Sequence, residues 1–311
     1  MESKGIPLKI QEVHVDNTDM KQIQWFPGHM AKTRRLIAAN LKLVDAVAEI
    51  VDARAPLSSR NPEMDSLTRG KPRLVILNKC DLADEKATQS WINYFKNNGA
   101  EAVAVDCKSG KGLKNILPAV KNKVLAELMA KREKNGMTGA AVRLMVVGIP
   151  NVGKSTVINR LSGAKHAKAE DRPGVTRTKQ WVKLDKSTEL LDMPGVLWPK
   201  FEDQDAAIRL AFTGAISDDI LDIETLAMKL LSYLAENYPQ SLRERYKIEF
   251  DDNDSGLSLL EKVGKKRGMM ISGGEINTER AAITVLDEFR SGKLGRITLE
   301  LPPKKEHICQ E

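Results

Sequence analysis

A glycine-bounded run that carries a lysine and two hydroxyl side chains has the composition of a phosphate-binding loop. Residues 148–156 read GIPNVGKST and fit the spacing GxxxxGK(S/T), between an apolar run and the helical stretch VINRL. A strand, such a loop and a helix surround a phosphate chain with backbone N–H groups and a helix N-terminus. We expect Lys154 at the outer phosphates and Ser155 on a magnesium ion. The predicted phosphate-site residues are Asn151, Val152, Gly153, Lys154, Ser155 and Thr156.

Two short motifs further along the chain could sense the γ-phosphate and complete the magnesium site. Asp192 and Gly195 have the DxxG arrangement, which suits a carboxylate that holds magnesium through water and a backbone contact with the γ-phosphate. Thr176 lies in the sequence PGVT between this motif and the phosphate loop, where its hydroxyl could complete the metal shell. The sequence therefore predicts Mg2+ held by Ser155, Thr176 and Asp192, and places Gly195 at the phosphates.

A second set of residues, earlier in the chain, could select the base. Residues 78–81 read NKCD and follow an apolar run, so they stand at the carboxyl end of a strand, where open α/β sheets bind ligands. The Asp81 carboxylate can accept from both N1–H and the exocyclic amine of guanine, which adenine cannot offer in that geometry. A backbone N–H after the next strand, assigned to Cys107, could meet the guanine oxygen. The predicted ligands are GTP and GDP, and the predicted guanine-site residues are Asn78, Lys79, Cys80, Asp81, Asp106 and Cys107.

These motifs need a mostly parallel sheet that brings them to one edge. Helical spacing at 90–96 and 113–130 predicts helices between strands, and the polar stretch 131–139 is typical of a linker. Short apolar runs predict buried parallel strands at 43–53, 73–77, 102–105 and 144–147.

The order of the motifs is the reverse of that in ordinary GTPases, because the base-reading residues precede the phosphate-binding ones. Joining the old chain ends and cutting the chain elsewhere preserves such a site when the termini lie close together. After residue 198 the apolar pattern becomes helical, with segments at 206–215, 223–237, 256–265 and 278–291. The predicted fold class is α/β: a P-loop GTPase fold with a parallel sheet, circularly permuted, followed by a small all-helical C-terminal domain.

Three parts of the chain are expected. Residues 1–20 form an N-terminal extension that we expect to be disordered, and Met20, followed at once by KQIQWFPGHM, is the expected natural start. The extension contains acidic residues, which mitochondrial transit peptides lack. Residues 21–204 form the permuted GTPase domain and residues 205–311 the helical C-terminal domain, in which Pro239 and a Gly-Gly pair at 273–274 are expected breaks.

Composition narrows the class of protein further. No run of the 311 residues approaches the roughly 18 to 20 apolar residues that a membrane-spanning helix needs. Three scattered cysteines fit a reducing cytosol, so the expected location is cytoplasmic. The net charge is +7, and residues 121–183 carry 14 basic against four acidic side chains. This excess favours a polyanionic partner, although part of it must serve GTP.

Several motifs together resemble the family of ribosome biogenesis GTPase A over about residues 21–300. The motifs, beyond those already described, are WFPGHMAK at 25–32, VDARAPLSSRNP at 51–62, DRPGVT, LLDMPGVLWPKFED at 190–203, KRGMMISGG at 266–274 and FRSGKLGRI at 289–297. The resemblance implies a bacterial cytoplasmic GTPase that assists late maturation of the large ribosomal subunit. It further implies that the helical domain binds ribosomal RNA, in the GTP state, with release after hydrolysis and without DNA as a partner.

The residue that positions the attacking water is not where many GTPases have it. Val196 takes the place of their glutamine and cannot hydrogen-bond to water. The resemblance implies that His29 takes this role, whereas from its sequence position alone His29 could simply cap the following helix. Asn151 resembles the asparagine of potassium-dependent GTPases, so K+ is a possible second cofactor. The alternative is that Asn151 is an ordinary loop residue without a role in cation binding.

Other readings of the sequence remain open. A nucleotide-gated RNA-binding scaffold with negligible turnover is favoured by Val196, and a P-loop ATPase or metabolite kinase would make NKCD a coincidence. Arg172, Arg177 and Lys179 could face nucleotide, RNA or solvent. In the helical domain two local basic clusters could bind RNA: Lys262, Lys265, Lys266 and Arg267, and Arg290, Lys293 and Arg296.

Overall fold

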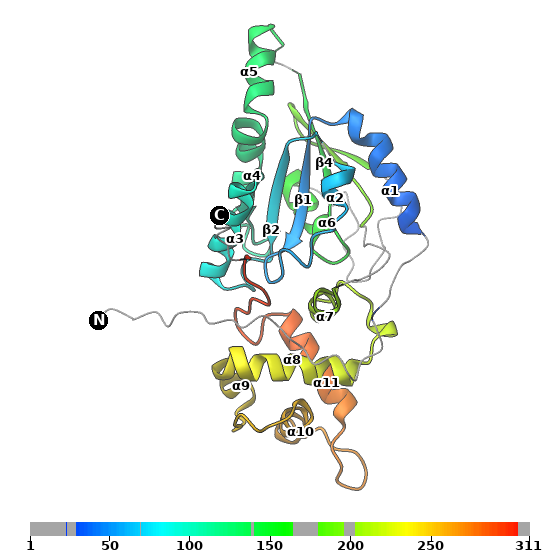
Figure 1. Ribbon diagram of the computed structural model, residues 1–311, viewed down its shortest axis with the longest axis vertical. Coiled ribbons are helices and arrows are strands. Elements are labelled where there is room, and N and C mark those ends of the chain that lie inside the picture. The colour runs from blue at the N-terminus through cyan, green and yellow to red at the C-terminus, as the bar shows by residue number, and fades with distance from the viewer. Residues whose placement is uncertain are drawn as a thin grey trace, which may run out of the picture.

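The computed structural model describes residues 23, 29–68, 70–137, 140–163, 180–195 and 203–303, with the side chains of residues 29–33 left out. In this part the chain forms a six-stranded sheet with helices on both faces, and a group of helices below it (Figure 1). The strand order is β3-β2-β1-β4-β6-β5. None of the helices in these ranges is long and apolar enough to cross a membrane.

The sheet is parallel except at one edge. β1 pairs in parallel with β2 on one side and with β4 on the other, and β6 continues the parallel order beside β4. β5 runs antiparallel to β6 at the edge. The strands are β1 (Ala46–Asp52), β2 (Arg73–Asn78), β3 (Glu101–Ala104), β4 (Val142–Val147), β5 (Gln180–Asp185) and β6 (Thr188–Asp192). The four predicted strands are confirmed with small shifts at their ends, and the guanine and phosphate motifs end the two strands that flank β1.

Alternate residues of β1 pack into different layers, as strand geometry requires. Val47 lies in a cluster with Ile37 of α1 and Met64 of α2, and Val51 lies in another with Trp91 of α3. Ile50 belongs to the large core cluster on the other face, which includes side chains of α4 and α6. The helices around the sheet are α1 (His29–Asn40), α2 (Met64–Leu67), α3 (Glu85–Asn97), α4 (Leu113–Ala119), α5 (Ala126–Lys134) and α6 (Lys154–Ser162).

The helix expected at 113–130 is a longer rod with an irregular middle. α4 passes into a π-helical segment, Val120–Val124, and then into α5, which continues to Lys134. The predicted linker at 131–139 is therefore wrong in its first half. The residues KREK that begin it are strong helix formers, so they extend α5 although none of its side chains is buried.

The C-terminal helices form what we call the helical module, residues 203–296. Side chains at the N-caps of four of these helices accept from the first-turn N–H groups; these residues are Asp203, Asp222, Ser255 and Asn277. Pro239 stands at the first position of a helix, where proline is favoured, so it starts a helix that the sequence did not predict. The helices are α7 (Gln204–Phe212), α8 (Ile223–Asn237), α9 (Pro239–Tyr246), α10 (Gly256–Lys266) and α11 (Thr278–Arg290).

The chain then returns to the sheet through residues 297–300, which we call the C-terminal strap. Ile297 N–H donates to the Leu82 carbonyl at 2.8 Å and Leu299 N–H to the Arg54 carbonyl at 2.7 Å. The indole N–H of Trp91 in α3 donates to the Glu300 carbonyl at 3.0 Å. The core cluster also runs without interruption from the sheet into the helical module. These contacts cross the domain boundary that was expected at residue 204.

Candidate guanine nucleotide site

Two glycines of the phosphate loop are required by close approach of the chain. A Cβ on Gly148 would lie 2.7 Å from the carbonyl oxygen of Ile50 in β1. Gly153 has φ +86°, and a Cβ there would lie 2.3 Å from the side-chain nitrogen of Asn78. α6 begins at the next residue, Lys154, so its first N–H groups face the loop as the sequence predicted.

The guanine motif and the phosphate loop are bonded to each other. The Asn78 amide donates to the carbonyl of Val152 at 2.7 Å, and the Lys79 ammonium donates to the carbonyl of Asn151 at 2.7 Å. The Cys107 thiol lies 3.3 Å from the Asn78 amide oxygen and donates to it. Residues that are more than 70 positions apart in the sequence thus form one site, in the permuted order that the motifs predicted.

The loop after β3 is shaped by its own carboxylate. Asp106 accepts from the N–H groups of Lys108 at 2.7 Å and Ser109 at 3.2 Å. Burial acts to raise the pKa of Asp106, but these hydrogen bonds outweigh it and the pKa is lowered. Burial raises the pKa of Cys107 to about 11, so its thiol is protonated at neutral pH. Asp81 is partly exposed, with the Lys108 ammonium 3.7 Å away.

Lys154 and Asp192, predicted to bind the outer phosphates and the metal, are in contact. Lys154 forms a buried ion pair with Asp192, and burial still raises the pKa of that carboxyl group despite the nearby ammonium. The second oxygen of Asp192, Oδ2, is buried without a hydrogen-bond partner in the described part of the chain. A partly buried Ser155 lies in the first turn of α6, and Gly195 packs against Pro150 of the phosphate loop. A buried carboxylate oxygen without a described partner fits a hard cation such as Mg2+.

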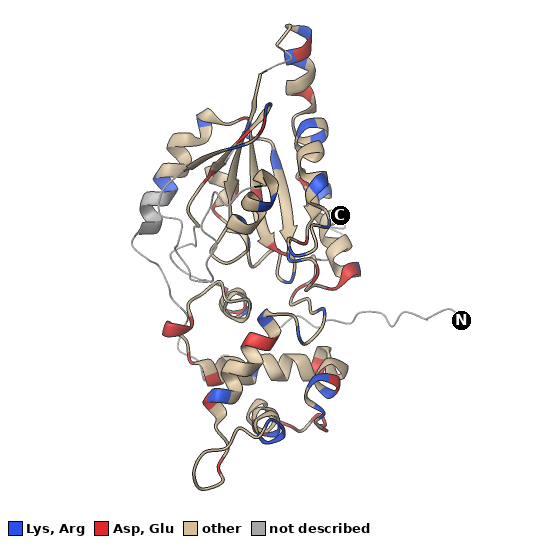
Figure 2. Cartoon of the chain, turned by 180° about the vertical axis from the view of Figure 1, so that it is seen from behind, with Lys and Arg blue, Asp and Glu red and all other residues tan. Residues whose placement is uncertain are grey.

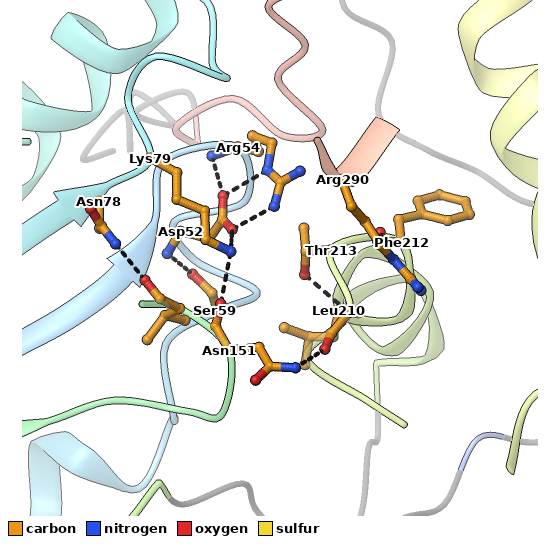
Figure 3. Close-up of polar contacts among 12 residues, drawn as sticks. Asp52, Arg54, Ser59, Asn78, Lys79, Asn151, Leu210, Phe212, Thr213 and Arg290 are labelled. Carbon is orange, nitrogen blue, oxygen red and sulfur yellow. Dashed lines mark hydrogen bonds and ion pairs between the residues drawn. The ribbon is translucent and has the colours of Figure 1, made fainter. Parts of the chain in front are cut away.

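A further carboxylate, Asp52 at the end of β1, organises the space beside the guanine motif (Figure 3). Its oxygens accept from Nε and Nη2 of Arg54 at 2.9 and 2.8 Å, and lie 3.0 Å from the Lys79 ammonium. Burial acts to raise the pKa of Asp52, but the two cations outweigh it and hold the pKa well below its ordinary value. Sequence reasoning assigned no role to this residue. The signal was the sequence DAR directly after an apolar strand.

The helical module contacts the phosphate loop directly. The side-chain nitrogen of Asn151 donates to the carbonyl of Gly214, just beyond α7, at 2.6 Å. A potassium ion would therefore need the other atom of this amide, Oδ1. The main chain of Asn151 has φ +61°, which is uncommon for a residue with a side chain.

Some predicted residues lie outside the described part of the chain. Thr176 and Val196 are among them, as are Arg172, Arg177 and Lys179. His29 begins α1, but its side chain is not described. Their predicted roles stay predictions.

Two of the predicted RNA-facing arginines have structural partners instead. Arg290 donates to carbonyls at the end of α7 and pairs with Asp218, and Arg267 pairs with Glu288. Lys262 is likewise paired with Asp254. Glu288 of α11, Asp218 before α8 and Asp254 before α10 pair with these cations, and residue type alone did not reveal the pairs. Lys265, Lys266 and Lys293 remain exposed.

Comparison with known proteins decides the family. Residues 143–249 match the family model described as 50S ribosome-binding GTPase. The chain is 49% identical to ribosome biogenesis GTPase A of Bacillus cereus over 90% of this chain and 94% of the relative. The chain belongs to the ribosome biogenesis GTPase A family. The Thermotoga maritima member is 30% identical over 93% of this chain and 98% of its own.

A solved structure agrees with this membership. The crystal structure of GNP-bound YlqF from T. maritima is 29% identical, with a TM-score of 0.60 over 88% of this chain and 99% of that one. As a member of the ribosome biogenesis GTPase A family, the protein binds guanine nucleotides, hydrolyses GTP and has a role in ribosome biogenesis. The permuted order and the P-loop GTPase fold are confirmed. A P-loop ATPase or metabolite kinase is excluded.

Proposed function

We propose that this GTPase acts in late maturation of the bacterial large ribosomal subunit, in the cytoplasm. It binds ribosomal RNA in its GTP state and leaves after GTP is hydrolysed to GDP and phosphate. The observation that carries the proposal is the permuted nucleotide site, in which the Asn78 and Lys79 side chains are bonded to the phosphate loop. The matched model, whose description names the 50S subunit, supports this choice of partner.

The guanine motif and the phosphate loop would bind different parts of the nucleotide. Asp81 reads the guanine edge and a backbone N–H of Cys107 meets its oxygen, while Lys154 and the first turn of α6 take the phosphates. Ser155, Thr176 and Asp192 would hold Mg2+, which neutralises charge on the phosphates. The unpartnered oxygen of Asp192 supports this assignment. We expect hydrolysis to saturate with Mg2+ and to stop when the ion is chelated.

The RNA-binding surface would lie on the helical module and would consist of small groups of basic side chains. Basic and acidic side chains are intermixed over the module (Figure 2), so no face of it acts through a uniform positive field. Lys265 and Lys266, at the exposed end of α10, and Lys293 supply the basic contacts. Phosphate contacts of this kind weaken as salt is raised.

The deciding experiment is multiple-turnover phosphate release by the full chain alone, with small subunits and with large subunits. We expect stimulation by large subunits only, because the site lacks the usual water-positioning glutamine and needs a partner to complete it. Equal rates under all three conditions would contradict the proposal. GTP-dependent binding to large subunits with negligible release throughout would favour the alternative of a nucleotide-gated scaffold. The same assay in potassium and sodium chloride tests the role of Asn151 with K+, which equal rates would exclude.

We propose that His29 positions the attacking water. His29→Ala should keep its affinity for GTP and lose about 10²-fold or more of the rate measured with large subunits, a typical loss for a positioned proton-handling group. Gln89→Ala, an exposed change on α3, is the control and should match the unchanged chain. A stimulated rate for His29→Ala equal to that of the unchanged chain would reject the assignment.

A further inference from the structure

Asn151 of the phosphate loop is held from two sides. Its carbonyl accepts from the Lys79 ammonium at 2.7 Å, and its amide donates to the Gly214 carbonyl at 2.6 Å. Its φ of +61° is a conformation that a residue with a side chain keeps only when its surroundings impose it. Lys154 follows three residues later. The two contacts on Asn151 therefore help to set the shape of the loop that receives the phosphates.

The contact between Asn151 and Gly214 is supported by Arg290 at the end of α11. The guanidinium lies beside Phe212 (Figure 3) and donates to its carbonyl at 3.1 Å. It also donates to the carbonyl of Ala211, in the same last turn of α7, at 2.9 Å. It also forms two bonds to Asp218, at 2.7 and 2.8 Å. Gly214, with φ +76°, packs so closely here that a Cβ would lie 3.3 Å from Nε of Arg290. Arg290 thus fixes the turn that presents the Gly214 carbonyl to the phosphate loop.

The contact between Lys79 and Asn151 is linked through other side chains to Phe289, the residue before Arg290 in α11. The buried Phe289 ring lies under the Arg54 guanidinium, 5.0 Å from ring centroid to Cζ. Arg54 makes a forked pair with Asp52, and Asp52 lies 3.0 Å from the Lys79 ammonium. Lys79 then reaches the carbonyl of Asn151. Two chains of contacts that start at adjacent residues of α11 therefore converge on one residue of the phosphate loop.

We propose that Arg290 is a positioning residue for the phosphate loop, and that Phe289 and Arg290 couple the place of α11 to nucleotide affinity through Asn151. A displacement of α11 moves the Gly214 carbonyl and the Arg54 side chain together. It therefore weakens both hydrogen bonds of Asn151, the one to Gly214 and the one from Lys79. Because coupling between two binding events is reciprocal, bound nucleotide also favours the docked place of α11. This inference requires guanine nucleotide binding alone and does not depend on the ribosomal partner.

The test is GDP affinity of the full chain, measured with a fluorescent GDP analogue. Arg290→Lys keeps a positive charge for Asp218 but loses the forked donors to the two α7 carbonyls. We expect it to raise the dissociation constant about fivefold, the size expected for a hydrogen bond that is lost. Arg280→Lys, the same change on an exposed residue of α11, is the matched control and should leave affinity unchanged.

A double-mutant cycle separates positioning from a general loss of structure. Asn151→Gly keeps the positive φ and removes the amide, so Arg290→Lys should have less than about a twofold effect in that background. The same loss of affinity in both backgrounds, or no loss in the natural one, would overturn the proposal. If circular dichroism shows that Arg290→Lys does not fold, Asp218→Asn replaces it in the cycle, because this change removes one partner of Arg290. Its effect on affinity should again be smaller in the Asn151→Gly background.

Discussion

Two carboxylates, at the ends of the strands β1 and β6 that flank β4, have opposite surroundings. Asp52 is held by Arg54 and by Lys79, and these cations lower its pKa in spite of burial. Among the described residues Asp192 pairs with Lys154 alone, and burial raises the pKa of Asp192 and leaves its Oδ2 without a partner there. The first carboxylate is already neutralised and serves the architecture of the site. The second has capacity for another cation, which is the property a magnesium ligand needs.

The role of Asp52 leads to a prediction about stability and pH. Its pKa is lower in the folded chain than its ordinary value of 3.8, so its ionised form stabilises the fold fully above about pH 5. Asp52→Asn should lower the free energy of unfolding by about 3 kcal/mol at pH 7, because it leaves two cations without their buried partner. The difference should shrink as the pH falls below about 4.

Guanidinium unfolding followed by circular dichroism at pH 7 and pH 3 measures this difference. Asp252→Asn, an exposed change in the loop before α10, is the control and should have little effect at either pH. A difference between Asp52→Asn and the unchanged chain that stays constant with pH would show that the charge of Asp52 is not the cause.

At the scale of elements, the C-terminal strap ties three parts of the molecule together. The buried Glu300 carboxylate accepts from the N–H groups of Leu57 and Ser58 in the turn after β1, and lies 3.5 Å from Arg209 of α7. Burial raises the pKa of Glu300 even though these partners act to lower it. The Glu300 carbonyl accepts a hydrogen bond from the indole N–H of Trp91 in α3. The strap thus joins α3, α7 and the turn after β1 without being a helix or a strand itself.

Trp91→Phe tests the strap by removing the indole N–H, and it also leaves a small cavity because Trp91 is fully buried. The smaller ring can still stack on Phe95, but the Glu300 carbonyl loses its donor, so we expect the free energy of unfolding to fall by about 2 kcal/mol. Thermal or denaturant unfolding measures this change. Tyr94→Phe removes a polar group from a partly exposed aromatic residue of the same helix and should change stability far less. Equal effects of the two substitutions would mean that the strap contact contributes nothing.

Much of the fold and site follows from the sequence, for reasons that these elements illustrate. The runs that became β1, β2 and β4 are apolar because both faces of a parallel sheet are buried, and the phosphate loop is fixed by spacing. β5 was missed because most of its side chains are exposed, and the strap because it has no periodicity. Asp52 was overlooked and Arg290 was misjudged because Lys79 and Asp218, which pair with them, lie in other elements, and residue type alone does not reveal such a partner.

For the whole molecule, the GTPase domain and the helical module share one core. The cluster on the α4 and α6 face of the sheet continues into the buried side chains of α7, α8 and α11. Figure 1 shows α7 directly below the sheet, and the Gly214 carbonyl after it reaches the phosphate loop. The module is therefore a structural part of the nucleotide site, whatever else it binds.

A fragment of residues 21–204 tests this conclusion. It lacks the Gly214 carbonyl, the strap and half of the shared core, so we expect its unfolding midpoint to fall by about 10 °C or more. Its affinity for GDP should fall as well. Scanning calorimetry and GDP titration measure the two properties, with residues 21–311 as the control for removal of the first 20 residues. A fragment that melts and binds GDP like the full chain would show that the module is an independent domain.

The sheet topology also sets the order in which the site can be assembled during synthesis. β1, the strand that pairs with both β2 and β4, is made first, so the unit of β1, β2 and β3 with its base-reading loop emerges complete before the phosphate loop exists. The last contacts come from the other end of the chain, because Leu299 and Glu300 close on residues made more than 200 positions earlier. An incomplete chain has a base-reading loop and no finished phosphate site. The contacts of Gly214 and Arg290 that support the phosphate loop are also made late, after most of the chain has been synthesised.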